Sequence, residues 1–142
     1  MLYVDSTVLV KRYVQELESP AADALLRLRE QSLFTSLITK AEVLSALVRA
    51  SRDRRLGTHG YNAAKTAFLE DWEGFRRVDV TANVLLPVER LVERHGLRGF
   101  DAAHLCTALF VGAPDFACFD NRLRAAAAAE GLRVLPHLIA TT

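Results

Sequence analysis

The amino-acid sequence predicts an α/β protein with a parallel central sheet of about five short strands and helices on both faces. Short apolar runs alternate along the chain with longer stretches in which apolar residues recur every three or four positions. The chain has 142 residues, of which 51% are hydrophobic and 25% are charged, so it is long enough to bury a core without disulfide or metal support. We therefore expect a single domain over residues 1–142.

In the first half of the chain, strands are expected where apolar residues cluster and helices where a capping signal precedes an amphipathic stretch. Ser19 and Pro20 are typical of an N-cap followed by the first residue of a helix. The expected elements are a strand over 2–4, a short helix from about Thr7, a helix over 19–30, a strand over 33–35 and a helix over 39–52.

The second half begins after Gly57 and Gly60, which mark a break between helices. A helix is expected to carry the aromatic face from Tyr61 to Phe75, and Gly96 is placed as the C-cap of a later helix. The segment 102–111 is apolar on all sides, which is typical of a helix buried in the core. The remaining expected elements are a strand over 78–80, a helix over 81–95, a strand over 115–119, a helix over 121–130 and an edge strand over 133–135.

Several classes of protein are excluded by composition and by short motifs. The uncharged segment 102–114 is shorter than the ~20 apolar residues of a membrane span, so no membrane partner is expected. The segment 1–5 has no basic stretch ahead of an apolar one, and we expect a cytoplasmic protein. Cys106 and Cys118 lie in apolar stretches and are interpreted as buried, reduced thiols. Neither a glycine-rich phosphate loop nor a nucleophile elbow occurs.

Four acidic residues stand in apolar surroundings, where an ionised carboxylate is costly unless something binds it. Asp5 follows the first strand and Asp120 follows the 115–119 strand, and ligands of open parallel sheets bind beyond the carboxyl ends of strands. Glu42 and Asp101 lie on largely apolar helices. Converging carboxylates raise one another's pKa unless a cation is bound, and a set of oxygen ligands selects Mg²⁺ or Mn²⁺.

Each of these acids also has a plainer interpretation. Asp5, Asp101 and Asp120 each precede a helix, where Asp is a favoured N-cap. Glu42 has the alternative of being a half-exposed residue on its helix. Capping and metal binding are compatible, so the residue pattern leaves both roles open.

Basic residues supply a second set of candidates, although the formal net charge of +1 alone indicates no nucleic-acid partner. His104 lies three residues beyond Asp101 and is interpreted as a satisfied core histidine rather than a residue at the rim of the site. A cluster of arginines near the end of the 39–52 helix either contacts a phosphate backbone or stabilises the carboxyl end of the helix dipole. Its members are Arg49, Arg52, Arg54 and Arg55.

Four segments resemble motifs of the PIN-domain ribonucleases, and more closely those of the VapC-type toxins of bacterial and archaeal toxin–antitoxin pairs. The resemblance covers residues 2 to about 136, and the order and spacing of the motifs are more specific than any one of them. The segments are Asp5-Ser6-Thr7-Val8-Leu9-Val10-Lys11-Arg12-Tyr13, Thr39-Lys40-Ala41-Glu42-Val43, Asp101-Ala102-Ala103-His104-Leu105 and Phe119-Asp120-Asn121-Arg122-Leu123.

The resemblance implies a single PIN-like domain and an endoribonuclease that hydrolyses RNA with Mg²⁺ or Mn²⁺. It maps Asp5, Glu42, Asp101 and Asp120 onto an acidic metal-binding quartet, in which Asp5 and Asp101 would be direct metal ligands. Glu42 would bind directly or through water and orient the nucleophile, and Asp120 would complete the site or hold a second ion. The resemblance also implies a cognate antitoxin protein as a partner and a homodimer as the assembly.

Two positions depart from the family pattern. Cys118 stands where many members have Ser or Thr, and Asn121 stands where some members have a further acid after Asp120. Both changes bear on a second metal site more than on the first.

Two other classes of function were weighed against the ribonuclease. An aspartyl-phosphate phosphatase would have an acid where Thr7 stands, and a receiver domain would have a lysine at a strand end, which none of the three lysines provides. A non-catalytic interaction module with a PIN-like fold would be expected to lose acids of the quartet, and all four are present.

Overall fold

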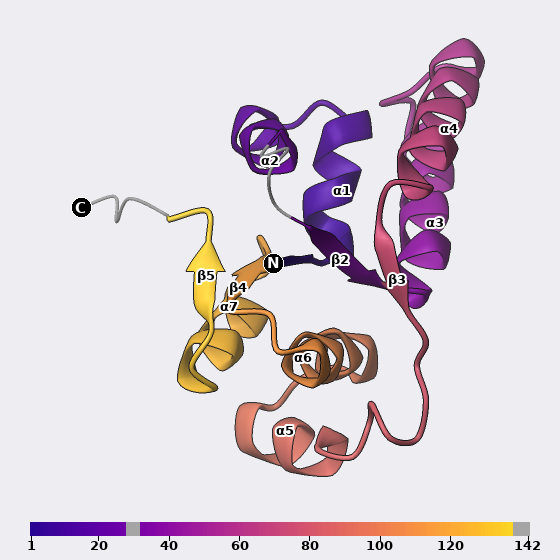
Figure 1. The fold of residues 1–142 in the computed structure, drawn as a ribbon. Coiled ribbons are helices and arrows are strands. Elements are labelled where there is room, and N and C mark those ends of the chain that lie inside the picture. Colours follow the sequence, from indigo (N-terminus) through magenta and orange to yellow (C-terminus); the bar gives the residue numbers. More distant parts are fainter. Residues whose placement is uncertain (28–31, 138–142) are drawn as a thin grey trace.

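The computed structural model describes residues 1–27 and 32–137, which form one five-stranded parallel sheet covered by helices (Figure 1). The α/β class and the parallel sheet are confirmed. The strands are β1 (Leu2–Val4), β2 (Leu33–Ser36), β3 (Arg76–Val78), β4 (Asp115–Ala117) and β5 (Arg133–Leu135). The helices are α1 (Ser6–Tyr13), α2 (Ser19–Leu26), α3 (Ile38–Arg52), α4 (Thr58–Trp72), α5 (Val88–His95), α6 (Gly99–Val111) and α7 (Asn121–Ala129).

The sheet has the strand order β3-β2-β1-β4-β5, so β1 lies at its centre. Tyr3 of β1 is in register with Phe34 of β2 on one side and with Phe116 of β4 on the other. The chain first adds strands on one side of β1 and then crosses to the other side to form β4. Ligand crevices of open parallel sheets form at such a switch in direction, beyond the carboxyl ends of the strands. Asp5 and Asp120 follow β1 and β4 at that edge.

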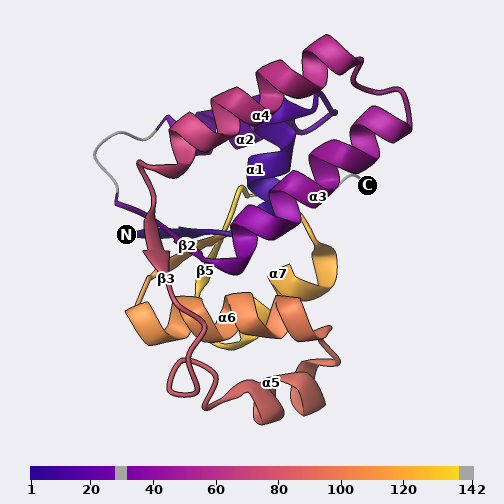
Figure 2. The same cartoon turned by 90° about the vertical axis from the view of Figure 1, so that its right-hand side faces the viewer.

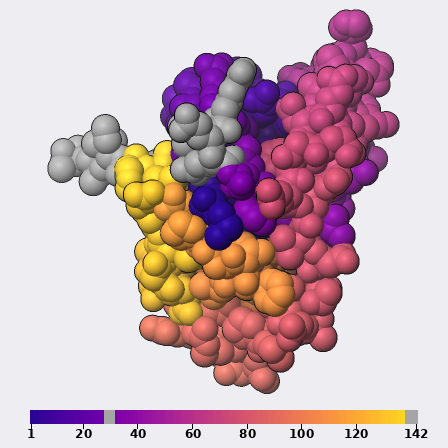
Figure 3. Space-filling view, viewed as in Figure 1, coloured from indigo at the N-terminus to yellow at the C-terminus, as the bar shows by residue number. Residues whose placement is uncertain are grey.

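Two hydrophobic clusters pack on opposite faces of the sheet. α1 to α4 lie over one face and α5 to α7 over the other (Figure 2). Leu2 and Val4 belong to the first cluster and Tyr3 to the second, because alternate side chains of a strand point to opposite faces. The space-filling view shows the same division, with α5 and α6 at one end of the molecule and α4 toward the other (Figure 3).

Three expected boundaries were wrong: the ends of α2 and α4 and the position of β3. The helix expected over 19–30 ends at Leu26, with Arg27 as its C-cap, and residues 28–30 lie outside the described residues. α4 ends at Trp72, although Phe75 is buried as expected. The strand expected over 78–80 lies instead at Arg76–Val78, paired with Phe34 to Ser36. β3 is an edge strand whose arginines are exposed, so apolar alternation does not mark it.

Two further corrections concern the second half. The helix expected over 81–95 begins at Val88, and turns occupy residues 82–87. Pro87 explains this, because proline has no N–H and its ring clashes with the preceding turn of a helix. The strand expected over 115–119 ends at Ala117, since the N–H of Phe119 donates to the Thr7 hydroxyl at 3.0 Å instead of to a strand.

The described residues also bear on the cysteines and on membrane insertion. Cys106 and Cys118 are free and buried, as expected. Burial raises the pKa of both thiols, which keeps them protonated. Among the described helices, none is both long and apolar enough to cross a membrane.

Candidate active site

Asp5 lies directly after the central strand and is 1% exposed. Its Oδ1 accepts hydrogen bonds from the backbone N–H of Thr7 at 3.0 Å and from the Thr7 hydroxyl at 2.5 Å. The residue is also the N-cap of α1, so its capping role is confirmed. Burial raises the pKa of Asp5, and the nearby His104 and the bonds from Thr7 reduce that rise. Asp5 is therefore a buried carboxylate with a fixed orientation.

Asp120 lies after β4 and is exposed at the start of α7. Its Oδ1 accepts from the backbone N–H of Leu123 at 2.9 Å, which confirms the N-cap role. The N–H of Asp120 donates to Cys118 Sγ at 3.2 Å. Cys118 thus provides an acceptor for the backbone at the turn that leads into α7.

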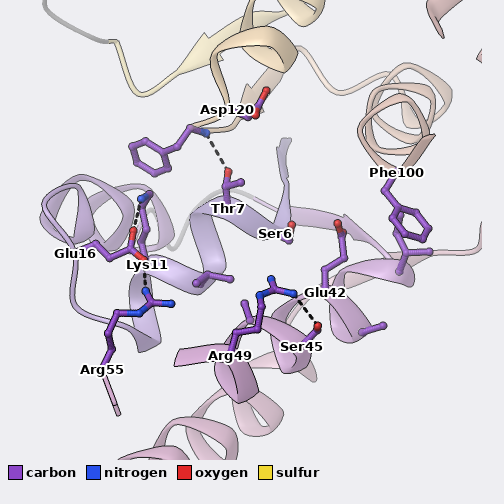
Figure 4. A pocket seen from close by; sticks show the side chains of 15 residues that line it. Ser6, Thr7, Lys11, Glu16, Glu42, Ser45, Arg49, Arg55, Phe100 and Asp120 are labelled. Atoms are coloured by element: carbon purple, nitrogen blue, oxygen red, sulfur yellow. Dashed lines mark hydrogen bonds and ion pairs between the residues drawn. The ribbon is translucent and has the colours of Figure 1, made fainter. Parts of the chain in front are cut away.

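Thr7 joins the two acidic strand ends. Its hydroxyl donates to Asp5. The same hydroxyl accepts from the N–H of Phe119, which is the neighbour of Asp120 (Figure 4). From the sequence, Thr7 was expected near the start of the first helix and had no assigned role in the site. The signal that was available is a hydroxyl residue two positions after a strand-end Asp, which is the spacing of a local Asx or N-cap bond.

Glu42 projects from α3 and meets a buried histidine. Its Oε1 lies 2.6 Å from Nε2 of His104, and Nδ1 of His104 lies 2.7 Å from the hydroxyl of Tyr3. The side chain of Glu42 is 25% exposed, whereas that of His104 is 1% exposed. His104 is therefore a satisfied core histidine, as expected, and it also contacts a member of the acidic quartet.

Asp101 lies in the first turn of α6, whose N-cap is Arg98, so the interpretation of Asp101 as a helix cap was wrong. Burial raises the pKa of Asp101. The charges of Asp120, Asp5 and Glu42 raise it further, and His104 opposes them. The structure thus brings the four acids near enough to influence one another, although they come from four separate segments.

The four carboxylates are not arranged as a ready ligand set. Within residues 1–27 and 32–137, no three Asp, Glu, His or Cys side chains form a group that could hold a metal ion. One oxygen each of Asp5, Glu42 and Asp120 accepts a hydrogen bond from the protein instead. The charges of the other three acids therefore affect Asp101, although one carboxylate oxygen of each of these three acids is hydrogen-bonded within the protein.

A groove of about 790 Å³ runs beside these acids, between α1, α3 and the first turn of α6 (Figure 4). Glu16, Glu42 and Asp120 line it, together with the cations Lys11, Arg49 and Arg55. Lys11 is neutralised by Glu16 at 2.6 Å and Glu18 at 3.1 Å. The groove therefore combines two of the four candidate acids with basic side chains, some of which are paired with Glu16.

The arginine cluster divides in two. Arg49 and Arg55 line the groove, whereas Arg52 and Arg54 are exposed outside it. Arg55 pairs with Glu16 at 3.5 Å. Arg49 donates to the Ser45 hydroxyl at 3.0 Å and, among the described residues, has no carboxylate within salt-bridge distance. Arg49 consequently presents the least compensated charge in the groove.

Phe100 is an aromatic residue of the groove that sequence reasoning missed. It precedes Asp101, is 64% exposed and projects from α6 toward the start of α3 (Figure 4). Tyr61 and Trp72, on the aromatic helix face expected from the sequence, are not available for stacking on a base. Trp72 is 3% exposed and Tyr61 packs against the first cluster.

The fold and the site together define a class of protein. It is a parallel α/β domain that carries acids and a groove with basic side chains at the carboxyl ends of its central strands. The PIN domain family matches residues 2–129, and the chain belongs to this family. The strand order differs from the 2-1-3-4-5 order of receiver domains, and Thr7 occupies the position of the phosphatase acid. Both aspartyl-phosphate alternatives are therefore rejected.

Named relatives agree with this assignment. The chain is 36% identical over 138 residues to ribonuclease VapC45 of Mycobacterium tuberculosis, covering 96% of this chain and 95% of that relative. The crystal structure of Mycobacterium tuberculosis VapC20, a Sarcin-Ricin loop cleaving toxin, is similar with a TM-score of 0.70 at 21% identity, covering 96% and 100% of the two chains. A toxin-antitoxin complex from Klebsiella pneumoniae has a TM-score of 0.61 at 18% identity, covering 84% and 87%. At these identities the two structures show the shared fold.

Proposed function

We propose that this protein is a Mg²⁺- or Mn²⁺-dependent endoribonuclease and the toxin of a type II toxin–antitoxin pair. The observation that carries the proposal is the meeting of four carboxylates beside a basic groove at the carboxyl ends of β1 and β4. The ribonuclease named among its relatives supports the reaction class, and the toxin with the same fold supports the biological role.

The acidic quartet suits a hard divalent cation. Its donors are carboxylate oxygens, which Mg²⁺ and Mn²⁺ prefer. The pKa of Asp101 is raised by burial first and then by the neighbouring acids, and a cation would relieve this second effect. Asp5 and Asp101 would be direct ligands, and Asp120 would complete the site or hold a second ion. Because the described side chains form no ligand group, metal binding would involve a change in the orientation of quartet carboxylates around Asp5, which Thr7 holds in place.

Each part of the site then has a chemical task. A divalent cation held by the quartet would lower the pKa of the attacking water and neutralise charge on the phosphate. Glu42 would orient that water, since one of its oxygens is held by His104 and the other is available to the groove. Asp5 would keep its place through the bonds from Thr7.

The groove favours an unpaired segment of RNA as substrate. Arg49 and Arg55 would bind backbone phosphates, and the exposed ring of Phe100 would stack on a base. A base in a duplex is not available for such stacking, whereas loops and single strands present their bases. Arg52 and Arg54 were expected to contact RNA with the other two arginines, and their position outside the groove makes them the weaker candidates.

We also propose that a cognate antitoxin protein neutralises this chain and that the chain pairs as a homodimer. A solved toxin-antitoxin complex shares the fold, which supports the first proposal. Co-expression with the product of a neighbouring gene should abolish RNA cleavage, and light scattering of the purified chain should give the mass of a dimer. A monomer whose cleavage no neighbouring gene product inhibits would contradict both proposals.

RNA cleavage by the purified protein tests the central proposal. Activity on structured RNA with exposed loops should appear with Mg²⁺ or Mn²⁺ and disappear in EDTA. Asp5→Asn should abolish the activity seen with either ion, which separates cleavage by this protein from a contaminating nuclease. Full activity in excess EDTA would reject the metal site. A folded wild-type protein that binds neither metal nor RNA would instead support the non-catalytic interaction module.

A further inference from the structure

A buried chain of hydrogen bonds leads from the middle of the sheet to the groove. It links Tyr3 of β1 to His104 of α6 and His104 to Glu42 of α3, with distances of 2.7 and 2.6 Å. Tyr3 is 0% exposed and the His104 side chain is 1% exposed, so only the Glu42 end of this series of hydrogen bonds reaches solvent. Three elements that are distant in sequence are thus joined at one member of the acidic quartet.

The rings of Tyr3 and His104 have little freedom to turn. Tyr3 stacks on Phe116 with ring centroids 5.4 Å apart and planes 7° apart. His104 meets the edge of Tyr3 at 5.9 Å and 69°. Burial raises the pKa of the Tyr3 hydroxyl, which therefore keeps its proton. The phenol is a permanent hydrogen-bonding group inside the core.

The partners also define the protonation of the imidazole. A carboxylate only accepts hydrogen bonds, so Nε2 of His104 must carry the hydrogen that it shares with Glu42. In the neutral imidazole Nδ1 is then an acceptor, and the hydroxyl of Tyr3 is in place to donate to it. This arrangement satisfies every polar atom of the ring, which a buried histidine requires.

We propose that Tyr3 and His104 are positioning residues that hold the Glu42 carboxylate by one oxygen and direct its other oxygen into the groove. This inference rests on the proposed ribonuclease function. Without the tether, a glutamate on a helix surface samples several rotamers, and fixing them has an entropic cost for each turnover. Groups that orient a metal ligand or its neighbour from behind are worth about 10- to 100-fold in metal affinity or activity.

Tyr3→Phe is the sharpest test, because it removes one hydroxyl and keeps the ring that stacks on Phe116. Its matched control is Tyr13→Phe. This variant removes a hydroxyl that donates to Asp71, at a distance of 2.6 Å, and that lies outside the groove. We expect Tyr3→Phe to lower kcat and Mn²⁺ affinity about tenfold or more, with KM for RNA unchanged. Tyr13→Phe should leave all three values at those of the wild type.

A double-mutant cycle separates positioning from general damage. If Tyr3 acts only through Glu42, Tyr3→Phe should have no further effect on kcat in a Glu42→Gln background. An equal loss in both backgrounds would overturn the proposal, as would wild-type kcat and Mn²⁺ affinity in Tyr3→Phe. Should Tyr3→Phe fail to fold, His104→Gln and His104→Leu replace it in the cycle. The amide of Gln can still donate to Glu42, so His104→Gln should retain more activity than His104→Leu.

NMR of the metal-free protein tests the tether without relying on activity. The Nε2–H proton of His104 should be protected from exchange, and Glu42→Gln should shift its resonance whereas Tyr13→Phe should not. A missing or rapidly exchanging signal would overturn the tether even in an active enzyme. A protected signal in a wild-type protein that neither cleaves RNA nor binds Mn²⁺ would overturn the proposed function, and the positioning role with it.

Discussion

Asp101 differs from the other two aspartates of the quartet because it caps no helix. Asp5 and Asp120 each accept an N-terminal N–H, and Asp101 instead lies in the first turn of α6. Helix capping therefore explains the positions of Asp5 and Asp120 but not that of Asp101. A role as a metal ligand explains it, although clustered negative charge destabilises the metal-free fold.

Replacing Asp101 by Asn should separate activity from stability. RNA cleavage should fall about a hundredfold or more, because the variant lacks one anionic ligand. In EDTA at neutral pH the melting temperature should hold or rise, since one repelling charge has been removed. Added Mn²⁺ should then stabilise the variant less than the wild type. A lower melting temperature in EDTA together with wild-type cleavage would contradict the role of Asp101 as a ligand.

The stability effect of Asp101→Asn should also depend on pH in a defined direction. Burial, and then Asp120, raise the pKa of Asp101 in the folded protein above the ordinary value of 3.8. The folded state therefore binds this proton more tightly than the unfolded state does, and ionisation opposes folding. The gain in melting temperature should be full above the raised pKa and vanish as the pH falls through it toward 3.8. A difference that is constant over this range would indicate another cause.

Phe100 and Phe110 form a natural pair for testing base stacking. They lie at opposite ends of α6 and are 64% and 54% exposed, but only Phe100 lines the groove. Loss of stacking on one base is worth ~1–3 kcal/mol, so Phe100→Ala should raise KM for single-stranded RNA about tenfold. Phe110→Ala should leave KM unchanged, and Phe100→Trp should restore it. Equal effects of the two Ala variants would reject the stacking role.

At the scale of elements, the sequence predicted helices and strands where a local signal existed. Ser19-Pro20 marked the start of α2, although the N-cap is Glu18 and not Ser19, and the apolar segment 102–111 marked the core helix, which begins earlier, at Gly99. The helix expected over 81–95 failed because its periodic pattern extended across Pro87, where local backbone chemistry overrides periodicity. The prediction of β3 failed because pairing with β2 selects its residues, and a partner 42 residues away (Phe34 with Arg76) leaves no local signal in an exposed edge strand.

Glu130 connects the end of α7 to α5. Its carboxylate, 7% exposed, lies 2.9 Å from Arg90, 3.3 Å from Arg94 and 2.9 Å from His95. The hydrogen bond with His95 and the two arginine charges lower the pKa of Glu130. These contacts hold the outer helix α5 against the helix layer that covers the second cluster.

Glu130→Gln should therefore destabilise the protein by about 1–2 kcal/mol at neutral pH, measured by urea unfolding. A lowered pKa means that the folded state binds the proton less tightly, so this contribution is complete above the ordinary value of 4.5 and is lost as the pH falls through the lowered pKa. Wild type and variant should then converge in acid. Glu89→Gln, at an exposed acid on α5, should change stability little at either pH. A gap between wild type and Glu130→Gln that persists in acid would contradict the charge-based origin.

At the scale of the whole molecule, the candidate site follows from the direction in which the sheet grows. β1 lies between β2 and β4, so Asp5 and Asp120, which follow β1 and β4, lie at the same edge of the sheet, where the chain switches from one side of β1 to the other. The sequence predicted that strand-end acids would share an edge, because all strands were expected to be parallel. The contact of Glu42 with His104 could not be predicted, because the two residues are 62 positions apart and the sequence around each one does not indicate its partner.

The basic groove is a local feature of a molecule whose formal net charge is only +1. Long-range attraction of RNA is therefore weak, and affinity depends on cations that face the groove without a carboxylate partner. Arg49 meets that description, whereas Arg52 shares its position in the last turn of α3 but lies outside the groove. Comparing Arg49 with Arg52 therefore distinguishes phosphate binding from stabilisation of the helix dipole. Both arginines can stabilise the dipole, but only Arg49 is placed to bind a phosphate in the groove.

Arg49→Gln and Arg52→Gln should thus have similar small effects on the melting temperature, since each removes one cation from the carboxyl end of α3. Only Arg49→Gln should weaken RNA binding, measured by titration of an Asp5→Asn protein with single-stranded RNA at several salt concentrations. The slope of log affinity against log salt should become shallower by about 0.7, the value of one phosphate contact to a single strand. If both variants change the slope equally, or neither does, Arg49 acts through the helix and the groove does not bind the backbone at that position.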